Sequence, residues 1–310
     1  MNMLNKQTVA LAIVSLFWFA PVGTALAKRA GGGGGGGHME RGIQLAQQKQ
    51  YDAAIAEFTK AIEANPKDPL GYTNRATAYR ASGRFAEAVA DYTKTIEISP
   101  KDHMAFRERG NTQVMQKQYD LALPDLEKAI ELKPDDTVAL QDRGIAEIGL
   151  QQWDKAAADF TTAIQKNPDD LLNYDRRAWA NRNLKNFQAA LEDYTVMLTK
   201  NSNDAEALIK RGSTYTSMMQ YEKAIADYEA ALKIKPDDYD TVQRLQYARG
   251  MLAGQNAPPP TPTPTPVESH VLTPLNIIIA VIMLIVIAVV VRLVTRGKEE
   301  PTSSASTRIR

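Results

Sequence analysis

The tetrapeptide NPKD at residues 65–68 returns in related form every 34 residues, as SPKD at 99–102, KPDD at 133–136, NPDD at 167–170, NSND at 201–204 and KPDD at 235–238. A fixed period of this length is the signature of a repeat array. The sequence therefore predicts six copies of one structural unit, at residues 35–68, 69–102, 103–136, 137–170, 171–204 and 205–238.

Within each unit the same residue types recur when the turn proline is numbered as position 32. Position 8 is always glycine or alanine, position 20 is always alanine, and position 17 is always aromatic. Positions 17, 20, 21, 24 and 28 form one face of a helix with a period of 3.6 residues. Small residues at positions 8 and 20 allow two helices to approach closely. Each unit is thus predicted to be a helical hairpin, and stacking of hairpins builds the core that one hairpin lacks.

This pattern resembles the tetratricopeptide repeat, or TPR, which has a small residue at position 8, alanine at 20, an aromatic residue at 24 and proline at 32. The resemblance covers residues 35–238 and implies an all-α fold, the TPR α-solenoid, a right-handed superhelix of helix-turn-helix repeats that binds peptides or protein segments. Residues 239–253 resemble the extra helix that closes such arrays. The TPR domain is therefore predicted to span residues 39–253.

The family resemblance also implies which residues line the inner groove, namely positions 2, 5, 9, 12 and 13 of the first helix in each repeat. In the central repeats the predicted peptide-binding residues are Met104, Arg107, Asn111, Met115, Gln141, Ile145, Ile148, Asp175, Trp179 and Arg182. Exposed apolar surface marks an interaction site, so an apolar segment is expected there, with Arg107 and Arg182 holding its acidic groups. The alternative is that these residues only pack first helices against one another.

The TPRs that bind chaperones hold a terminal carboxylate with five polar residues, and this chain departs from their pattern. The matching positions hold Arg107, Asn111, Asp142, Leu172 and Arg176. Asp142 would repel a carboxylate and Leu172 supplies no charge, so this carboxylate clamp is not expected.

Position 7 is usually leucine in the family but is arginine in all six repeats, and position 23 is acidic in all six. One interpretation is a basic stripe for an anionic ligand. The favoured interpretation is a hydrogen-bonded arginine–carboxylate pair between the two helices of each hairpin, because every hairpin needs the same contact whereas a ligand rarely does.

Composition excludes several classes of function. The chain has 37 basic and 36 acidic residues, so it has no charge excess that would indicate nucleic-acid binding. It has no cysteine, and its three histidines are scattered, so no metal site is expected. Motifs for nucleophilic catalysis or phosphate binding are also missing. We therefore expect no enzyme, no catalytic residue, no cofactor and no small-molecule substrate.

The N-terminal residues 1–27 have the features of a secretory signal peptide. Lys6 precedes an apolar run, and Ala25-Leu26-Ala27 forms a small-x-small cleavage site. An uncleaved signal anchor is the alternative. Residues 28–38 form a glycine-rich linker, which is either a natural spacer or the remnant of a cloning linker.

The C-terminal part has three predicted segments. Residues 254–271 form a linker rich in proline and threonine, which favours an extended spacer; an SH3-type ligand or a glycosylated stalk are sharper alternatives. Residues 275–294 are predicted to form a transmembrane helix, since Leu275 to Val291 contains one polar residue. Basic residues in the tail, 295–310, place that tail in the cytoplasm by the positive-inside rule.

Together these segments predict a membrane-anchored TPR scaffold whose repeats lie on the extracytoplasmic side, in the periplasm or at the cell surface, and bind a protein or peptide partner. Two alternatives remain open at this stage. One is a structural envelope protein that assembles with itself. The other is a tail-anchored protein with cytosolic repeats, which leaves residues 1–27 unexplained.

Overall fold

The computed structural model of the protein describes residues 36–256 and 274–296, and in these ranges it contains fourteen helices and no strand. The chain divides after Gln255 into two units, an array of helices and a single later helix. The predicted signal peptide, the predicted linker after residue 256 and the tail beyond residue 296 lie outside the described residues.

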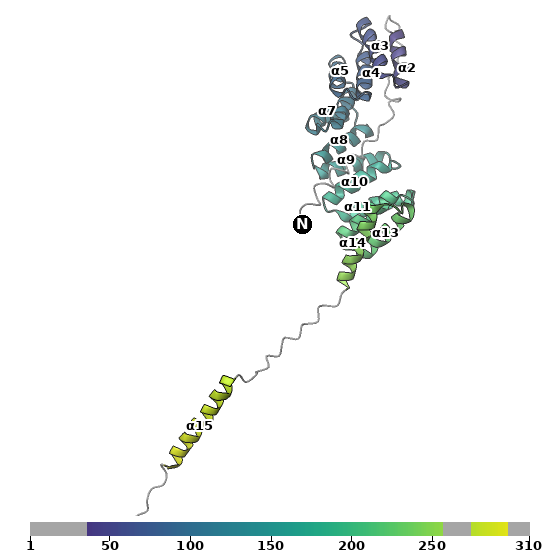
Figure 1. Ribbon diagram of the computed structural model, residues 1–310. Coiled ribbons are helices and arrows are strands. Elements are labelled where there is room, and N and C mark those ends of the chain that lie inside the picture. The colour runs from purple at the N-terminus through teal and green to yellow at the C-terminus, as the bar shows by residue number, and fades with distance from the viewer. Residues whose placement is uncertain (1–35, 257–273, 297–310) are drawn as a thin grey trace, which may run out of the picture. The chain divides into compact units, whose positions relative to one another are not determined.

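The array consists of six helical hairpins that follow one another in chain order (Figure 1). Their helices are α2 (Gly36–Gln47) with α3 (Tyr51–Ala64), α4 (Pro69–Ala81) with α5 (Phe85–Ile98), α6 (His103–Met115) with α7 (Tyr119–Leu132), α8 (Thr137–Gly149) with α9 (Trp153–Lys166), α10 (Leu171–Asn183) with α11 (Phe187–Lys200), and α12 (Ala205–Ser217) with α13 (Tyr221–Ile234). A last helix, α14 (Tyr239–Gln255), packs on α13. The predicted solenoid of six helix-turn-helix units is confirmed.

The repeated Pro-Asp turn starts each new hairpin because its last residue caps the following helix. The carboxylate of Asp68 accepts a hydrogen bond from the Leu70 N–H at 3.0 Å, and the aspartates 34, 68, 102 and 136 residues further on do the same at α6, α8, α10 and α12. Such caps satisfy backbone donors that have no partner inside the helix. The shorter turn inside each hairpin contains one residue with positive φ, which is Gly83 in the second repeat.

The hairpin core follows the predicted small-against-large pattern. The alanines at position 20 are completely buried, and the large residues at position 24 are at most 1% exposed. A Cβ atom on Gly144 would lie 2.8 Å from the Phe160 ring, so glycine at position 8 is what allows this ring to pack against α8.

The predicted arginine–carboxylate pair between the two helices of a hairpin, called the brace from here on, is confirmed in five repeats. In each of these the arginine donates two hydrogen bonds to an aspartate. In the third repeat Arg109 donates from Nε and from its terminal nitrogen to the two oxygens of Asp125, both at 2.6 Å. The equivalent pairs are Arg75–Asp91, Arg143–Asp159, Arg177–Asp193 and Arg211–Asp227. Arg109 also donates to Thr93 in the preceding hairpin at 2.9 Å, so this arginine joins two repeats as well as two helices.

The first repeat departs from this pattern. Arg41 lies 3.8 Å from Glu57, while His38 approaches the same carboxylate at 2.6 Å. Residues 36–38 were predicted as linker, but they are helical, because α2 begins at Gly36 and His38 contacts α3. At the other end α14 continues to Gln255, two residues beyond the predicted end of the capping helix.

The second unit contains the helix α15 (Pro274–Arg296). Among the described residues no helix is long and apolar enough to cross a membrane, so the predicted transmembrane helix is not confirmed. The apolar side chains from Ile282 to Val291 are about half exposed.

Candidate functional site

The first helices of the hairpins line one side of the array. Helix α6 contacts α8 directly, as α2 contacts α4 and α12 contacts α14, whereas the second helices of neighbouring hairpins make no contact of similar extent. The array is therefore narrower on the side of the first helices, and all ten predicted groove residues belong to α6, α8 and α10 on that side.

Charged and polar residues of this inner surface are bonded to one another across the repeats. Arg80 on α4 forms an ion pair with Glu108 on α6 at 2.6 Å. Arg107 contacts Glu108 at 2.6 Å and Asp136, the cap of α8, at 3.1 Å. The positive charge of Arg107 is thus compensated within the array, and an acidic group of a partner would have to compete with two carboxylates.

Three further predicted residues continue this network. Asn111 accepts a hydrogen bond from Arg80 at 3.0 Å and donates to Asp142 at 2.9 Å. Gln141 donates to Asp170 at 2.7 Å, and Asp175 pairs with Lys210 at 2.8 Å. These contacts link the first helices from α4 to α12, so the polar part of the groove is preorganised by its own hydrogen bonds.

The apolar members of the predicted set differ in how far they are accessible. Met104 is 43% exposed, and Val138, at the same position of the next repeat, is 47% exposed. Met115 and Ile145 are half-buried, whereas Ile148 is 7% exposed and belongs to the core between α8 and α10. The most accessible apolar side chains therefore lie at position 2 of α6 and α8.

Two residues of the fifth repeat complete the set. The Trp179 ring meets Trp153 edge to face, with the ring centroids 5.1 Å apart, and is half-buried. Arg182 is half-buried, and its Nε has no hydrogen-bond partner among the described residues. The central groove thus combines an apolar edge, an aromatic pair and one arginine whose charge is not taken up by an ion pair in the described part of the chain.

The carboxyl group of Asp142 is part of this buried network, and its protonation makes the stability of the array depend on pH. Burial raises the pKa of the Asp142 carboxyl to about 7, and the hydrogen bond from Asn111 opposes this shift only partly. The folded chain therefore retains a proton that the unfolded chain has lost, so stability falls as pH rises from about 4 to about 7. The variant Asp142→Asn keeps the acceptor for Asn111 and removes the titration.

We expect Asp142→Asn to raise the free energy of unfolding, and to raise it by about 3 kcal/mol more at pH 8 than at pH 5. Urea unfolding of the full chain at both pH values measures this difference. Glu206→Gln, at an exposed carboxylate on α12, is the control and should give the same small change at both values. An equal gain from Asp142→Asn at pH 5 and pH 8 would show that the carboxyl does not titrate in this range.

The fold and its inner surface together define a class of protein, the α-solenoids built from helical hairpins. Models of the tetratricopeptide repeat match residues 36–68, 69–102, 108–136, 142–205 and 205–238. These matches cover most of the array, and the chain belongs to the tetratricopeptide repeat family.

Individual relatives match shorter stretches of sequence. Tetratricopeptide repeat protein 36 of Caenorhabditis elegans is 49% identical over 43 residues, which are 14% of this chain and 24% of that protein. Hsp70-Hsp90 organizing protein 2 of Arabidopsis thaliana is 40% identical over 48 residues, which are 16% of this chain and 8% of that protein. The chain therefore matches a quarter or less of the length of these curated relatives.

Solved structures match over a longer range. YrrB, described as a TPR protein with an unusual peptide-binding site, is 25% identical with a TM-score of 0.56, over 62% of this chain and 97% of that chain. PilF of Pseudomonas aeruginosa has a TM-score of 0.56 at 15% identity, over 70% of this chain and 96% of that chain, and so resembles this chain in fold.

Proposed function

We propose that this chain is a scaffold that binds a peptide segment of a partner protein along the inner surface of its repeats. The observation that carries the proposal is the pair of exposed apolar residues, Met104 and Val138, at one position of successive first helices beside a hydrogen-bonded polar network. A rigid surface of this kind has little ordering cost on binding, which favours affinity. The similarity to YrrB, whose description includes a peptide-binding site, supports the same conclusion.

The chemistry of the surface favours a segment that is mainly apolar. Arg80 and Arg107 already have carboxylate partners, so acidic groups gain little from the second to the fourth repeat. Arg182 is the arginine of the predicted set that forms no ion pair with a described residue, although its Nε is buried, and Trp179 lies on the same helix. Trp and Arg are frequent anchors of protein interfaces.

The double variant Met104→Glu, Val138→Glu is expected to reduce partner capture by the full chain at least tenfold, because it places two charges on the apolar edge. Capture from an extract of the source cells, followed by mass spectrometry, measures the loss. The matched control is Leu121→Glu, at an apolar residue on the second helix α7 that is exposed as well. Equal loss with the control, or no loss with the double variant, would exclude the inner surface as the binding site.

We further propose that the scaffold is membrane-anchored and extracytoplasmic. The support is the sequence. Residues 275–291 contain one polar residue, Arg292 follows directly and Arg296 lies four residues later, and residues 1–27 have the features of a signal peptide. In this proposal residues 254–271 separate the repeats from the bilayer, and the C-terminal tail is cytoplasmic.

Alkaline carbonate extraction of cells that express the full chain tests the anchor. We expect the chain to stay in the membrane pellet, and the variant Ile285→Arg, Val286→Arg to move to the supernatant, because charges near the bilayer centre are costly. Release of the unaltered chain by carbonate would contradict the anchor and leave the groove proposal untouched. Protease added to spheroplasts tests the sidedness. We expect it to cleave the repeats and to leave the C-terminal tail intact, because the tail is proposed to be cytoplasmic.

A further inference from the structure

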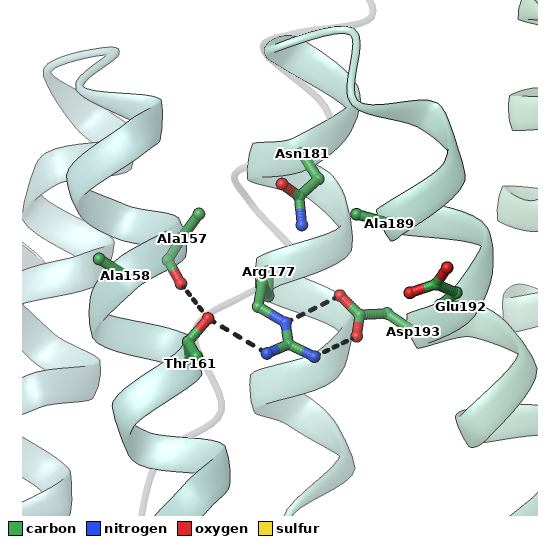
Figure 2. A pocket seen from close by; sticks show the side chains of 8 residues that line it. All are labelled: Ala157, Ala158, Thr161, Arg177, Asn181, Ala189, Glu192 and Asp193. Carbon is green, nitrogen blue, oxygen red and sulfur yellow. Dashed lines mark hydrogen bonds and ion pairs between the residues drawn. The ribbon is translucent and has the colours of Figure 1, made fainter.

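A cleft of about 350 Å³ lies between the second helices α9 and α11, with α10 behind it, on the side of the array away from the proposed groove. Figure 2 shows its lining. Ala157, Ala158 and Thr161 come from α9, Arg177 and Asn181 from α10, and Ala189, Glu192 and Asp193 from α11.

Two departures from the repeat pattern shape this cleft. Position 21 is a branched apolar residue in five repeats, but it is Ala157 in the fourth. The five others are Ile55, Val89, Leu123, Leu191 and Ile225. Position 11 is Asn181 in the fifth repeat, whereas the other five repeats have Leu45, Tyr79, Gln113, Glu147 and Tyr215 there. Ala157 and Asn181 line the same cleft. A cleft of about 460 Å³ lies at the equivalent place of the next repeat, where Leu191 and Tyr215 line it. The cleft beside Asn181 therefore differs from that one in its smaller apolar side chain and in its carboxamide at position 11.

The chemistry of the cleft is given by Asn181. This residue is 8% exposed, and its side chain makes no hydrogen bond with any described residue. In Figure 2 its carboxamide points into the cleft, between Ala157 and Ala189 and above the Arg177–Asp193 pair. Thr161 is also engaged, because it accepts a hydrogen bond from Arg177 at 3.1 Å and donates to the Ala157 carbonyl at 2.7 Å. The free carboxamide is therefore the group that a ligand would meet.

A carboxamide offers one acceptor and two donors, and its natural complement is another amide. The missing atoms at position 21 are those of a leucine or isoleucine side chain. Glu192 adds a negative charge at the cleft, at a position that is alanine in four of the other repeats. An occupant with an acidic neighbouring group is therefore disfavoured, whereas a neutral or basic one is accepted.

We propose that this cleft is a second binding site, which takes a leucine-like side chain of a partner segment and hydrogen-bonds the backbone amide of that residue through Asn181. The site is separate from the inner surface, so it allows the array to hold two segments at once. Its occupation does not depend on the groove proposal.

The probe for the test is N-acetyl-L-leucinamide, which carries the side chain and both amide groups and no charge. The full chain is labelled with ¹³C at the alanine methyl groups and titrated in detergent solution. We expect saturable shifts of the Ala157, Ala158 and Ala189 methyl signals at millimolar probe. N-acetylglycinamide, which lacks the side chain, should give no saturable shift.

Two variants separate binding from folding. Ala157→Leu restores the residue type of the other repeats, so it should leave the fold intact. Its side chain should occupy the space beside Asn181 and weaken binding of the probe, measured at the Ala189 methyl signal, at least tenfold. Asn181→Ala keeps the space but removes the carboxamide, and should also lower the affinity for the probe several-fold. Failure of the unaltered chain to show saturable shifts at these methyl groups, or unchanged affinity in both variants, would overturn the proposal.

Discussion

Replacing Phe160 by alanine is expected to lower the free energy of unfolding by about 3–5 kcal/mol, the range found when a buried phenylalanine is removed from a core. Phe160 is completely buried on α9 and packs between α8 and α10. Gly144 brings α8 so close to the ring that neighbouring helices cannot simply move inward to fill the space. The loss therefore combines the burial of the ring with the cavity left behind.

The measurement is urea unfolding of the full chain followed by tryptophan fluorescence, since Trp153 and Trp179 belong to the same cluster. Phe160→Leu is the matched variant, because Leu126 occupies the equivalent position of the third repeat, and it should cost about 1 kcal/mol. A cost below about 1 kcal/mol for Phe160→Ala would mean that this ring does not hold the fourth hairpin together.

The second large effect concerns the brace between Arg109 and Asp125. Asp125→Ala is expected to cost about 3 kcal/mol, because Arg109, whose side chain is 20% exposed, would keep its charge without the carboxylate. Its remaining hydrogen bond to Thr93 is too weak to compensate for this loss. Since the pair is mostly shielded from solvent, added salt should change the cost little.

The double variant Arg109→Leu, Asp125→Ala is expected to recover most of this loss and to come within about 1 kcal/mol of the unaltered chain, because no unpaired charge remains. The same unfolding experiment, with Arg109→Leu as the second single variant, completes a double-mutant cycle for the pair. A double variant that is as unstable as the sum of the two single variants would show that arginine and aspartate contribute independently.

The hairpins and their braces were predictable because each feature occurs six times. One arginine at position 7 says little, but six arginines opposite six acidic residues indicate one contact repeated in every unit. The exception in the first repeat also has a sequence signal, since His38 stands where the other repeats have a large apolar residue. That histidine contacts Glu57 and displaces Arg41 from the bidentate geometry.

The polar network of the inner surface could not be predicted in the same way. Its contacts join different repeat positions, such as Arg107 with Asp136 at the end of the same repeat and Asn111 with Asp142 of the next repeat. Each pair type occurs only once or twice. The prediction that Arg107 is available for acidic groups of a partner overlooked Glu108 and Asp136. A usable signal existed, because Arg107–Asp136 and Gln141–Asp170 are both separated by 29 residues.

The cleft beside Asn181 could be predicted from the sequence only in part. Ala157 and Asn181 are visible in the sequence as departures from their repeat positions, but they lie in different repeats and on different helices. Their proximity follows from the stacking of α9, α10 and α11, so the structure was needed to recognise them as parts of one site.

Site-specific photo-crosslinking in the source cells tests most directly whether the inner surface binds a partner. A benzoylphenylalanine residue replaces Val138 on the inner surface, or Leu121 on the second helix α7; both native side chains are exposed. The proposed function predicts a discrete crosslinked species from position 138 that position 121 does not give, and that Met104→Glu abolishes. Crosslinking from position 121 alone, or none from position 138, would contradict a partner segment on this surface.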